Sequence, residues 1–476
     1  MTIQTKLGEY KKKIEIFDIL ERREQKKREL TLKYGLSSLP VELRAKEMKE
    51  VYIDTGDFDI NAYKIKLGKE ERWNIAQYLT DDEVPLRGFG GFPPQFSLIF
   101  SAKVSDSDGL LQSEHCYFGG GTGMGKTNLS SLFAVGFHKR PNPSSIIWFS
   151  QKQGTVDTDM RLVGNVLKSQ NKKTVFIDFE KDNPMGKIPI DILNLDEISI
   201  LFNFKGGDVR AFSSIYEQTG MIEGTMKTAI KEFIKTPQGQ IYAPQYNGLV
   251  DGNIFSFKKS DDMKITNNTT FLVSLTGIYR KNKSIVDIII SAYMRYFYRE
   301  ISLNNQTVRL NTLIPKEKKY LKQHQGIILF DEFFELTNKF KGKKSNTLDT
   351  ATEIASQGRS EGTSLILATQ TTSNAGAAKD VYNQSSYIMQ FKTTYQTDIN
   401  FITRVLGMAT SKYMRLATEL FLRIFPFAGG ENPRGRIILF AKEPINGNES
   451  RIKCIKLSLF SELEEKVMVS IKGEEL

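Results

Sequence analysis

The stretch Gly120-Gly121-Thr122-Gly123-Met124-Gly125-Lys126-Thr127 matches the pattern G-x-x-x-x-G-K-[S/T], which is typical of a phosphate-binding loop. Apolar Tyr117-Phe118 precede it, and residues 128–135, NLSSLFAV, follow with helix-like spacing. A strand, a glycine loop and a helix are the setting that this motif needs. The glycines let successive backbone N–H groups turn toward phosphate oxygens, and the helix N-terminus adds the positive end of its dipole. The stretch therefore predicts a nucleotide site on an α/β fold.

Two side chains of this loop have expected roles in holding a nucleotide. The Lys126 ammonium would reach the β- and γ-phosphates, and the Thr127 hydroxyl would be a ligand of Mg²⁺. We expect ATP or GTP with Mg²⁺, and the alternative is a glycine-rich turn that fits the pattern by chance. The expected nucleotide-binding residues are Gly120, Gly121, Thr122, Gly123, Met124, Gly125, Lys126, Thr127 and Asn128.

The composition is that of an ordinary globular protein. The chain has 476 residues, of which 40% are hydrophobic and 25% are charged, and this length is enough for two or three domains. Apolar runs such as Ile327-Ile328-Leu329-Phe330 are far shorter than the roughly 18 residues of a membrane-spanning helix. The first residues lack the apolar region of a secretory signal. We therefore expect no transmembrane segment and a cytoplasmic location, with recruitment to a membrane complex as a further option.

Cysteines, histidines and charge narrow the function classes. Only Cys116, Cys454 and three histidines occur, and their spacing excludes a disulfide framework or a zinc cluster. We expect His115, beside Cys116, to pack in a strand rather than to bind a metal. The net charge of +11 suits a polyanionic partner such as nucleic acid, but it is weak support, because many lysine-rich proteins have no such partner.

Strand and helix patterns alternate from residue 96 onward, which predicts a three-layer α/β domain. We place this domain at residues 96–445, between an N-terminal helical and irregular region, 1–95, and a C-terminal tail, 446–476. Its most apolar strands would be buried on both faces, which favours a mainly parallel sheet. The predicted strands are Phe96–Phe100, His115–Phe118, Ser145–Phe149, Thr174–Phe179, Gly326–Asp331, Ser364–Thr369, Tyr387–Phe391 and Arg436–Phe440.

Two segments break this alternation. Residues 194–320 carry helical patterns around Ile222–Ile234 and Ser284–Ile301, which predict a mostly helical insertion. Residues 5–50 have apolar positions at three- and four-residue steps, which predict one or two amphipathic helices. Within these helices, residues 22–29 form a mixed-charge stretch that fits a solvated helix face or, as the less favoured alternative, a nucleic-acid-binding arm.

A second motif would supply the acids that hydrolysis of a nucleotide needs. The apolar strand pattern that starts at Gly326 ends in Asp331 and Glu332, and ligands bind at the carboxyl ends of strands in open α/β sheets. We expect Asp331 to fix Mg²⁺ and Glu332 to polarise the attacking water. The alternative is a buried strand that ends in two surface acids.

A third motif follows farther along the chain. The strand pattern Ser364–Thr369 ends in Gln370, whose amide could hydrogen-bond the γ-phosphate or the attacking water. A polar strand end that faces solvent is the alternative for this position. Immediately upstream, the sequence Gln357-Gly358-Arg359-Ser360-Glu361-Gly362-Thr363 places an arginine before the strand.

Together the three motifs carry a family resemblance. GGTGMGKT at 120–127, GIILFDE at 326–332 and GRSEGTSLILATQ at 358–370 resemble the FtsK–HerA superfamily of P-loop motors, which includes the coupling ATPases of conjugative and type IV secretion systems. In those families a helix with an arginine leads through a small residue into an apolar strand that ends in Thr-Gln. The resemblance covers roughly residues 110–445, and the insertion is similar in layout to the all-α domain of the coupling ATPases. It implies a RecA-like P-loop NTPase fold with a mainly parallel central sheet and a mostly helical insertion. The N-terminal helical region is predicted from periodicity alone, because the first hundred residues carry no resemblance.

The resemblance also implies a homo-oligomeric ring, a hexamer, with ATP at the subunit interfaces and double-stranded DNA in the central channel. Such a site needs a cation from the neighbouring subunit to stabilise charge on the transferring phosphoryl group. Arg359 is the first candidate, followed by Arg404 and Arg161, and each could equally be a structural surface arginine. Some members carry an arginine directly after Thr-Gln, whereas Thr371 stands there in this chain.

A lysine-rich stretch follows the Asp-Glu motif. Lysines on loops that face a channel would grip phosphates without sequence specificity. A flexible solvated loop is an equal alternative for this stretch. The DNA-contact candidates are Lys339, Lys341, Lys343 and Lys344.

Three functions are compatible with these motifs. The first is an ATP-hydrolysing ring motor that translocates double-stranded DNA in conjugative transfer, packaging or end processing. The second is a secretion-type ATPase that moves protein cargo, with the N-terminal helices as the docking site of a protein partner. The third is a nucleotide-gated scaffold or defence module, against which Glu332 argues because it favours turnover.

Overall fold

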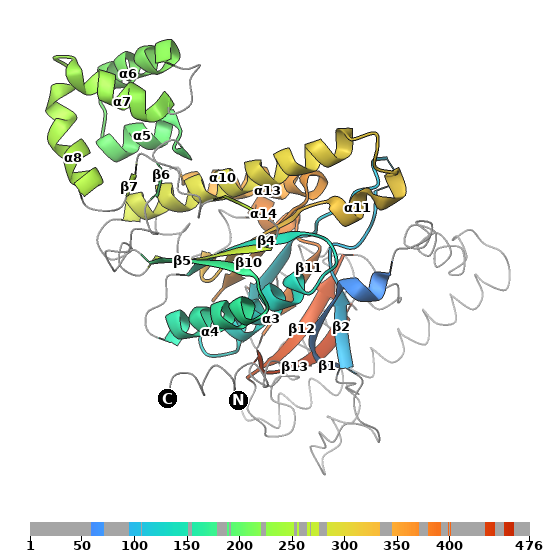
Figure 1. The fold of residues 1–476 in the computed structure, drawn as a ribbon. Coiled ribbons are helices and arrows are strands. Elements are labelled where there is room, and N and C mark those ends of the chain that lie inside the picture. The colour runs from blue at the N-terminus through green and yellow to red at the C-terminus, as the bar shows by residue number, and fades with distance from the viewer. Residues whose placement is uncertain are drawn as a thin grey trace, which may run out of the picture.

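Figure 1 shows the fold in a computed structural model of the chain. The structure describes residues 59–70, 95–105, 107–150, 155–178, 188–189, 192–219, 225–251, 255–256, 264–266, 268–275, 283–333, 345–370, 379–391, 398, 400, 434–442 and 452–460. The amphipathic helices predicted for residues 5–50 lie outside the described residues.

In the described part of the chain, an 11-stranded sheet forms the centre of the fold, in the order β2-β1-β13-β12-β11-β3-β10-β9-β4-β8-β5. The strands from β11 to β5 run parallel to one another. Every residue of β3, β4, β9 and β10 is buried, as expected for strands that are covered on both faces. The parallel strands are β11 (Tyr387–Gln390), β3 (Cys116–Gly119), β10 (Thr363–Thr369), β9 (Gln325–Phe330), β4 (Ser144–Ser150), β8 (Thr269–Ser274) and β5 (Lys173–Asp178).

Four antiparallel strands extend the sheet beyond β11. They are β12 (Arg436–Ala441), β13 (Ile452–Leu457), β1 (Lys64–Glu70) and β2 (Gln95–Ile99). Because β12 runs opposite to β11 and β13 runs opposite to β12, the start of β12 and the end of β13 lie at the same edge as the carboxyl ends of the parallel strands. We call this edge the carboxyl edge of the sheet.

Helices cover both faces of the sheet, as Figure 1 shows. Alternate residues of β3 enter opposite cores: Phe118 packs with Phe133 on one face, whereas Tyr117 packs in the cluster that contains Ile354 on the other. The helices of the first face are α3 (Lys126–His138) and α4 (Thr155–Ser169), and those of the second are α10 (Lys283–Leu310) and α13 (Asn346–Glu361).

A group of helices lies beside the N-terminal half of α10 (Figure 1). Its members are α5 (Leu195–Phe202), α6 (Gly206–Thr219), α7 (Thr225–Lys235) and α8 (Ala243–Asp251). The buried Glu197 carboxylate of α5 accepts two hydrogen bonds, each 2.5 Å, from the Arg295 guanidinium of α10. A two-point guanidinium–carboxylate pair fixes orientation as well as distance, so this pair holds the helical group on α10.

The remaining elements are short. They are the 3-10 helices Ile60–Tyr63, Gln240–Tyr242 and Lys316–Lys318, the helices α11 (Lys319–Lys322) and α14 (Lys379–Asn383), and a two-stranded sheet of β6 (Ile188–Pro189) and β7 (Phe255–Ser256). None of the helices that the structure describes is long and apolar enough to cross a membrane.

The predicted α/β fold with a mainly parallel sheet is confirmed, and each of the eight strand patterns corresponds to a strand. The boundaries differ from those expected. β1 lies within 1–95 and β13 within 446–476, yet both pair in the central sheet, because each places apolar residues in the core: Ile65 and Leu67 in β1, and Ile455 and Leu457 in β13. β8 lies within 194–320, yet it pairs with β4 and β5. A short apolar run of this kind cannot be separated from a helix segment by periodicity.

All three histidines of the chain are buried in the fold. Burial lowers the pKa of His115 and of His138 to about 3 and that of His324 to about 4. His115 Nδ1 accepts a hydrogen bond of 3.0 Å from the Leu365 N–H, and Nε2 donates to the Ala355 carbonyl at 3.1 Å. Both contacts fit a neutral imidazole that joins the start of β3 to β10 and α13.

We expect these histidines to make the protein less stable as pH falls from about 6.5 to about 5. Unfolded histidine titrates near pH 6.5, whereas the folded pKa values are lower, so the unfolded state binds more protons in this range. Each such group lowers the free energy of unfolding by up to about 1.4 kcal/mol per pH unit. Urea unfolding across this range checks the effect. A His324→Gln variant should show a shallower pH dependence than the native chain, and equal slopes would contradict the explanation.

Candidate nucleotide-binding site

The glycine-rich loop lies between β3 and α3, at the carboxyl edge of the sheet. Gly125 is the N-cap of α3 with φ +110°, and Gly123 has φ +76°, conformations that residues with a Cβ rarely adopt. A Cβ built on Gly123 would meet no atom within 4 Å, and the first turn of α3 has no acidic residue. An open loop at a helix N-terminus without competing carboxylates fits the oxygens of a phosphate group.

The Lys126 ammonium lies inside this loop. The residue is 3% exposed, and Nζ donates to the Gly120 carbonyl at 2.5 Å and to the Gly121 carbonyl at 3.1 Å. Nζ also lies 3.8 Å from Glu332 Oε1. The lysine is thus placed between the phosphate-binding loop and the acidic motif, where it can exchange a carbonyl partner for a phosphate oxygen.

Thr127 and Asp331 come together from distant parts of the sequence. The Thr127 hydroxyl donates to Asp331 Oδ2 at 3.3 Å, and the Asp331 N–H donates to the Phe149 carbonyl of β4 at 2.9 Å. Asp331 is fully buried at the end of β9. A hydroxyl and a carboxylate are hard oxygen ligands, so this pair fits Mg²⁺ better than a softer metal.

Glu332 follows in an unusual backbone conformation. Its φ is +61°, in the left-handed region, and the residue is 3% exposed. A non-glycine residue in this region costs about 1–2 kcal/mol, which the surrounding structure has to offset. Tyr117 is buried, and its burial raises the pKa of its hydroxyl group. Tyr382, Asp398 and Glu332 raise this pKa further. The left-handed backbone at Glu332 turns the chain away from the direction of β9. The Glu332 carboxylate then lies 3.8 Å from Lys126 Nζ.

Gln370 lies next to the loop, as its strand pattern predicted. β10 pairs with β3 in register Thr369 to Gly119, and the Gly120 N–H donates to the Thr369 carbonyl at 3.2 Å. Gln370 therefore follows β10 at the level where the phosphate-binding loop begins. Its side chain is half-buried.

A second glutamine on the other side of β3 was not predicted. Gln390 ends β11, in register with Gly119, and is 1% exposed. Its Nε2 donates to the Phe391 carbonyl at 3.0 Å, while Oε1 has no hydrogen-bond partner within the described part of the chain. The sequence did hold a signal for it, because the predicted strand Tyr387–Phe391 contains a polar residue near its carboxyl end, as the Thr-Gln strand does.

Arg359 lies at the opposite edge of the sheet from the loop. It stands near the end of α13, before β10 begins, is exposed, and donates a hydrogen bond to the Ser386 hydroxyl before β11. The seven residues of β10 span about 23 Å at ~3.3 Å per residue, so Arg359 is far from the loop of its own chain. Arg359 thus does not belong to the residues that meet at the carboxyl edge.

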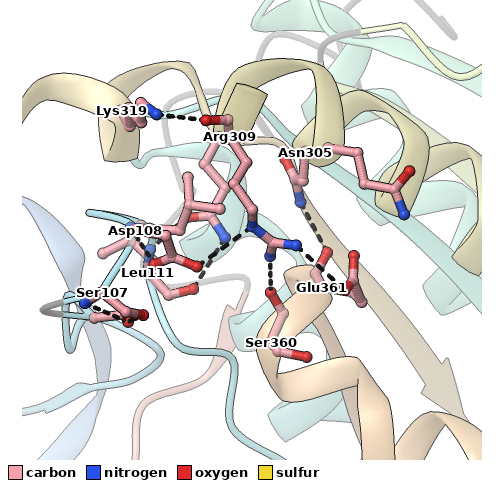
Figure 2. Close-up of polar contacts among 12 residues, drawn as sticks. Ser107, Asp108, Leu111, Asn305, Arg309, Lys319, Ser360 and Glu361 are labelled. Carbon is pink, nitrogen blue, oxygen red and sulfur yellow. Dashed lines mark hydrogen bonds and ion pairs between the residues drawn. The ribbon is translucent and has the colours of Figure 1, made fainter. Parts of the chain in front are cut away.

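Figure 2 shows how the rest of this motif is held. Arg309, near the end of α10, donates to the Ser360 carbonyl at 3.0 Å and forms ion pairs with Asp108 at 3.4 Å and Glu361 at 3.6 Å. Asn305 donates to the Glu361 carbonyl at 2.8 Å. These contacts fix the end of α13 on α10, which gives Ser360 and Glu361 a structural role that the sequence did not reveal.

Arg161 does not join this site. The Arg161 guanidinium lies 5.4 Å from the centroid of the Phe176 ring, which fits a surface cation–π contact between α4 and β5. Arg404 and the lysine candidates Lys339, Lys341, Lys343 and Lys344 lie outside the described residues.

The fold is similar to those of several solved structures. One is VirB4 of Thermoanaerobacter pseudethanolicus, with a TM-score of 0.50 and 10% identity, over 84% of this chain and 98% of that chain. Another is the cytoplasmic domain of the Thermomonospora curvata type VII secretion ATPase EccC, with a TM-score of 0.41 and 11% identity, over 86% and 31%. A third is the plasmid coupling protein TrwB in complex with ADP and Mg²⁺, with a TM-score of 0.40 and 11% identity, over 72% and 85%.

No protein-family model matches the chain, and no curated protein matches it either. The likeness to VirB4 covers most of both chains, and it supports the α/β fold that the three motifs predicted.

Proposed function

We propose that the chain is an ATP-hydrolysing ring motor that translocates double-stranded DNA. The observation that carries this proposal is the meeting of two distant motifs at the carboxyl edge of the sheet. Lys126 lies 3.8 Å from Glu332, and Thr127 lies 3.3 Å from Asp331. In this arrangement Lys126 would bind the β- and γ-phosphates, Thr127 and Asp331 would hold Mg²⁺, and Glu332 would orient the attacking water. Gln370 would sense the γ-phosphate from the neighbouring strand.

The place of Arg359 is compatible with a ring. An exposed arginine far from the loop of its own chain can stabilise a transferring phosphoryl group only on a neighbouring subunit. A head-to-tail contact between copies would close into a ring, and the superfamily resemblance favours a hexamer. Arg359 remains our first candidate for the arginine finger on this basis.

DNA as the cargo is supported by charge and by the order of the motifs. The net charge of +11 favours a polyanion, and the segment with Lys339, Lys341, Lys343 and Lys344 begins shortly after Glu332 and ends at the start of α13. Lysines in such a segment would link the state of the nucleotide to contacts with the phosphate backbone.

DNA-stimulated hydrolysis tests this proposal. We expect linear duplex DNA to raise the rate of ATP hydrolysis severalfold, and we expect the stimulation to fall as salt rises, because phosphate contacts release counterions. Heparin is the matched control, since a polyanion without a helical track should stimulate less than DNA of equal charge.

The other outcomes separate the alternatives. A rate that duplex DNA of any length leaves unchanged would overturn the DNA reading. Stimulation by a protein partner in the absence of DNA would favour protein cargo. A protein that binds ATP but hydrolyses none, with or without DNA, would contradict a motor of either kind.

A further inference from the structure

The sheet order fixes the direction in which a bound nucleotide would lie. The residues expected at the γ-phosphate and Mg²⁺, Asp331, Glu332 and Gln370, follow β9 and β10, on one side of β3. A triphosphate is linear, so the α-phosphate and the nucleoside have to leave the loop toward the other side. On that side of β3 lie β11, β12 and β13.

Two chain segments on that side contact the loop and α3 directly. The Gly435 N–H, before β12, donates to the Met124 carbonyl at 2.9 Å, and the Leu457 N–H, at the end of β13, donates to the Gly435 carbonyl at 2.7 Å. Gly435 has φ +75°, and a Cβ built on it would meet no atom within 4 Å. The start of β12 and the end of β13 thus form an open surface next to the phosphate-binding loop.

Asn128 of α3 ties the residues after β13 to this surface. Its Nδ2 donates to the Ser458 carbonyl at 2.9 Å, and its Oδ1 accepts from the Phe460 N–H at 2.8 Å. Both polar atoms of the amide are therefore used to hold the backbone of residues 458–460. Asn128 directly follows Thr127, so this segment lies where the α-phosphate end of a nucleotide would emerge.

The middle residue of this segment remains exposed. The Ser458 N–H donates to the Leu67 carbonyl of β1 at 3.0 Å, and the Phe460 ring packs in the core beneath α3. Leu459, between these two anchors, is 53% exposed. An apolar side chain held in solvent by a fixed backbone beside a phosphate site is suited to cover the face of a nucleobase.

We propose that residues 458–460 form the nucleoside wall of the nucleotide site, with Leu459 against the purine base. This inference rests on the proposed function and adds where the nucleoside lies. The contact is apolar and reaches only the face of the ring, so it serves adenine and guanine alike. Asn128 is a positioning residue in this arrangement, since it acts through the backbone of the segment.

Comparison of two ligands tests the proposal, because inorganic triphosphate has the phosphates of ATP without the nucleoside. We expect Leu459→Ser to weaken binding of a non-hydrolysable ATP analogue with Mg²⁺ by about five- to tenfold, as measured by titration calorimetry. Binding of Mg²⁺-triphosphate should stay unchanged. Leu313→Ser is the matched control, since Leu313 is 90% exposed and lies beyond α10, before the amino end of β9, and it should alter neither ligand.

The results that would overturn the proposal are distinct from failure of the proposed function. Unchanged affinity of Leu459→Ser for the ATP analogue would remove Leu459 from the nucleoside site. Equal weakening of both ligands would show that the substitution acts on the phosphate loop, which also contradicts the proposal. A native chain that binds neither ligand would overturn the proposed function itself, and the nucleoside wall with it.

Discussion

Lys126→Ala is expected to reduce ATP hydrolysis by about a hundred- to a thousandfold. The Lys126 ammonium is buried between the glycine loop and Glu332, where solvent cannot replace it as a stabiliser of phosphate charge. Removal of one such group from a water-excluded site has this effect in other enzymes. The measurement is steady-state hydrolysis with saturating Mg²⁺-ATP, together with the affinity for ATP, which should also fall.

Lys139→Ala is the matched control for this variant. Lys139 is exposed at the C-cap of the same helix α3, so its removal changes charge and helix composition without touching the loop. We expect hydrolysis by Lys139→Ala to stay close to that of the native chain. Thermal unfolding of both variants is needed as well, since loss of Lys126 leaves the buried Glu332 without this cation and lowers stability. A folded Lys126→Ala that hydrolyses ATP at the native rate would contradict the site.

Apart from β8, the sequence predicted the parallel half of the fold well, for a physical reason. Strands such as β9 and β10 are buried on both faces, so they are continuous apolar runs that end abruptly in polar residues. The antiparallel half was harder to predict. β1 and β13 mix lysines with apolar residues, and which strands they pair with depends on contacts between the two ends of the chain.

The site was predicted to the extent that it consists of local motifs. Lys126, Thr127, Asp331 and Glu332 each stand in a motif whose spacing indicates a role, and the fold brings these side chains together. The motif that contains Arg359 is different, because its neighbours Ser360 and Glu361 bind Arg309 from a helix far away in the sequence. The tie between Asn128 and residues 458–460 is likewise a contact of distant segments, and no local pattern marks it.

Glu332→Gln is expected to separate nucleotide binding from hydrolysis. Glutamine has the shape of glutamate but cannot accept a proton from water, so hydrolysis should fall by about a hundred- to ten-thousandfold. Binding of Mg²⁺-ATP should persist, because Lys126, Thr127 and Asp331 remain in place. The fold should persist too: Glu332 is in the left-handed region, and glutamine bears the same backbone cost there as glutamate.

Single-turnover hydrolysis and ATP binding, measured side by side, check this expectation. Glu353→Gln, on the exposed face of α13, is the matched control and should behave as the native chain does. Glu332→Gln also decides between a motor and a nucleotide-gated scaffold, since a motor needs turnover and a scaffold needs only the bound nucleotide. If the variant binds ATP, hydrolyses none and no longer moves DNA, hydrolysis drives the movement. If it assembles rings and keeps full biological activity, the scaffold reading replaces the motor, whereas an unchanged rate of hydrolysis would remove Glu332 from the catalytic role.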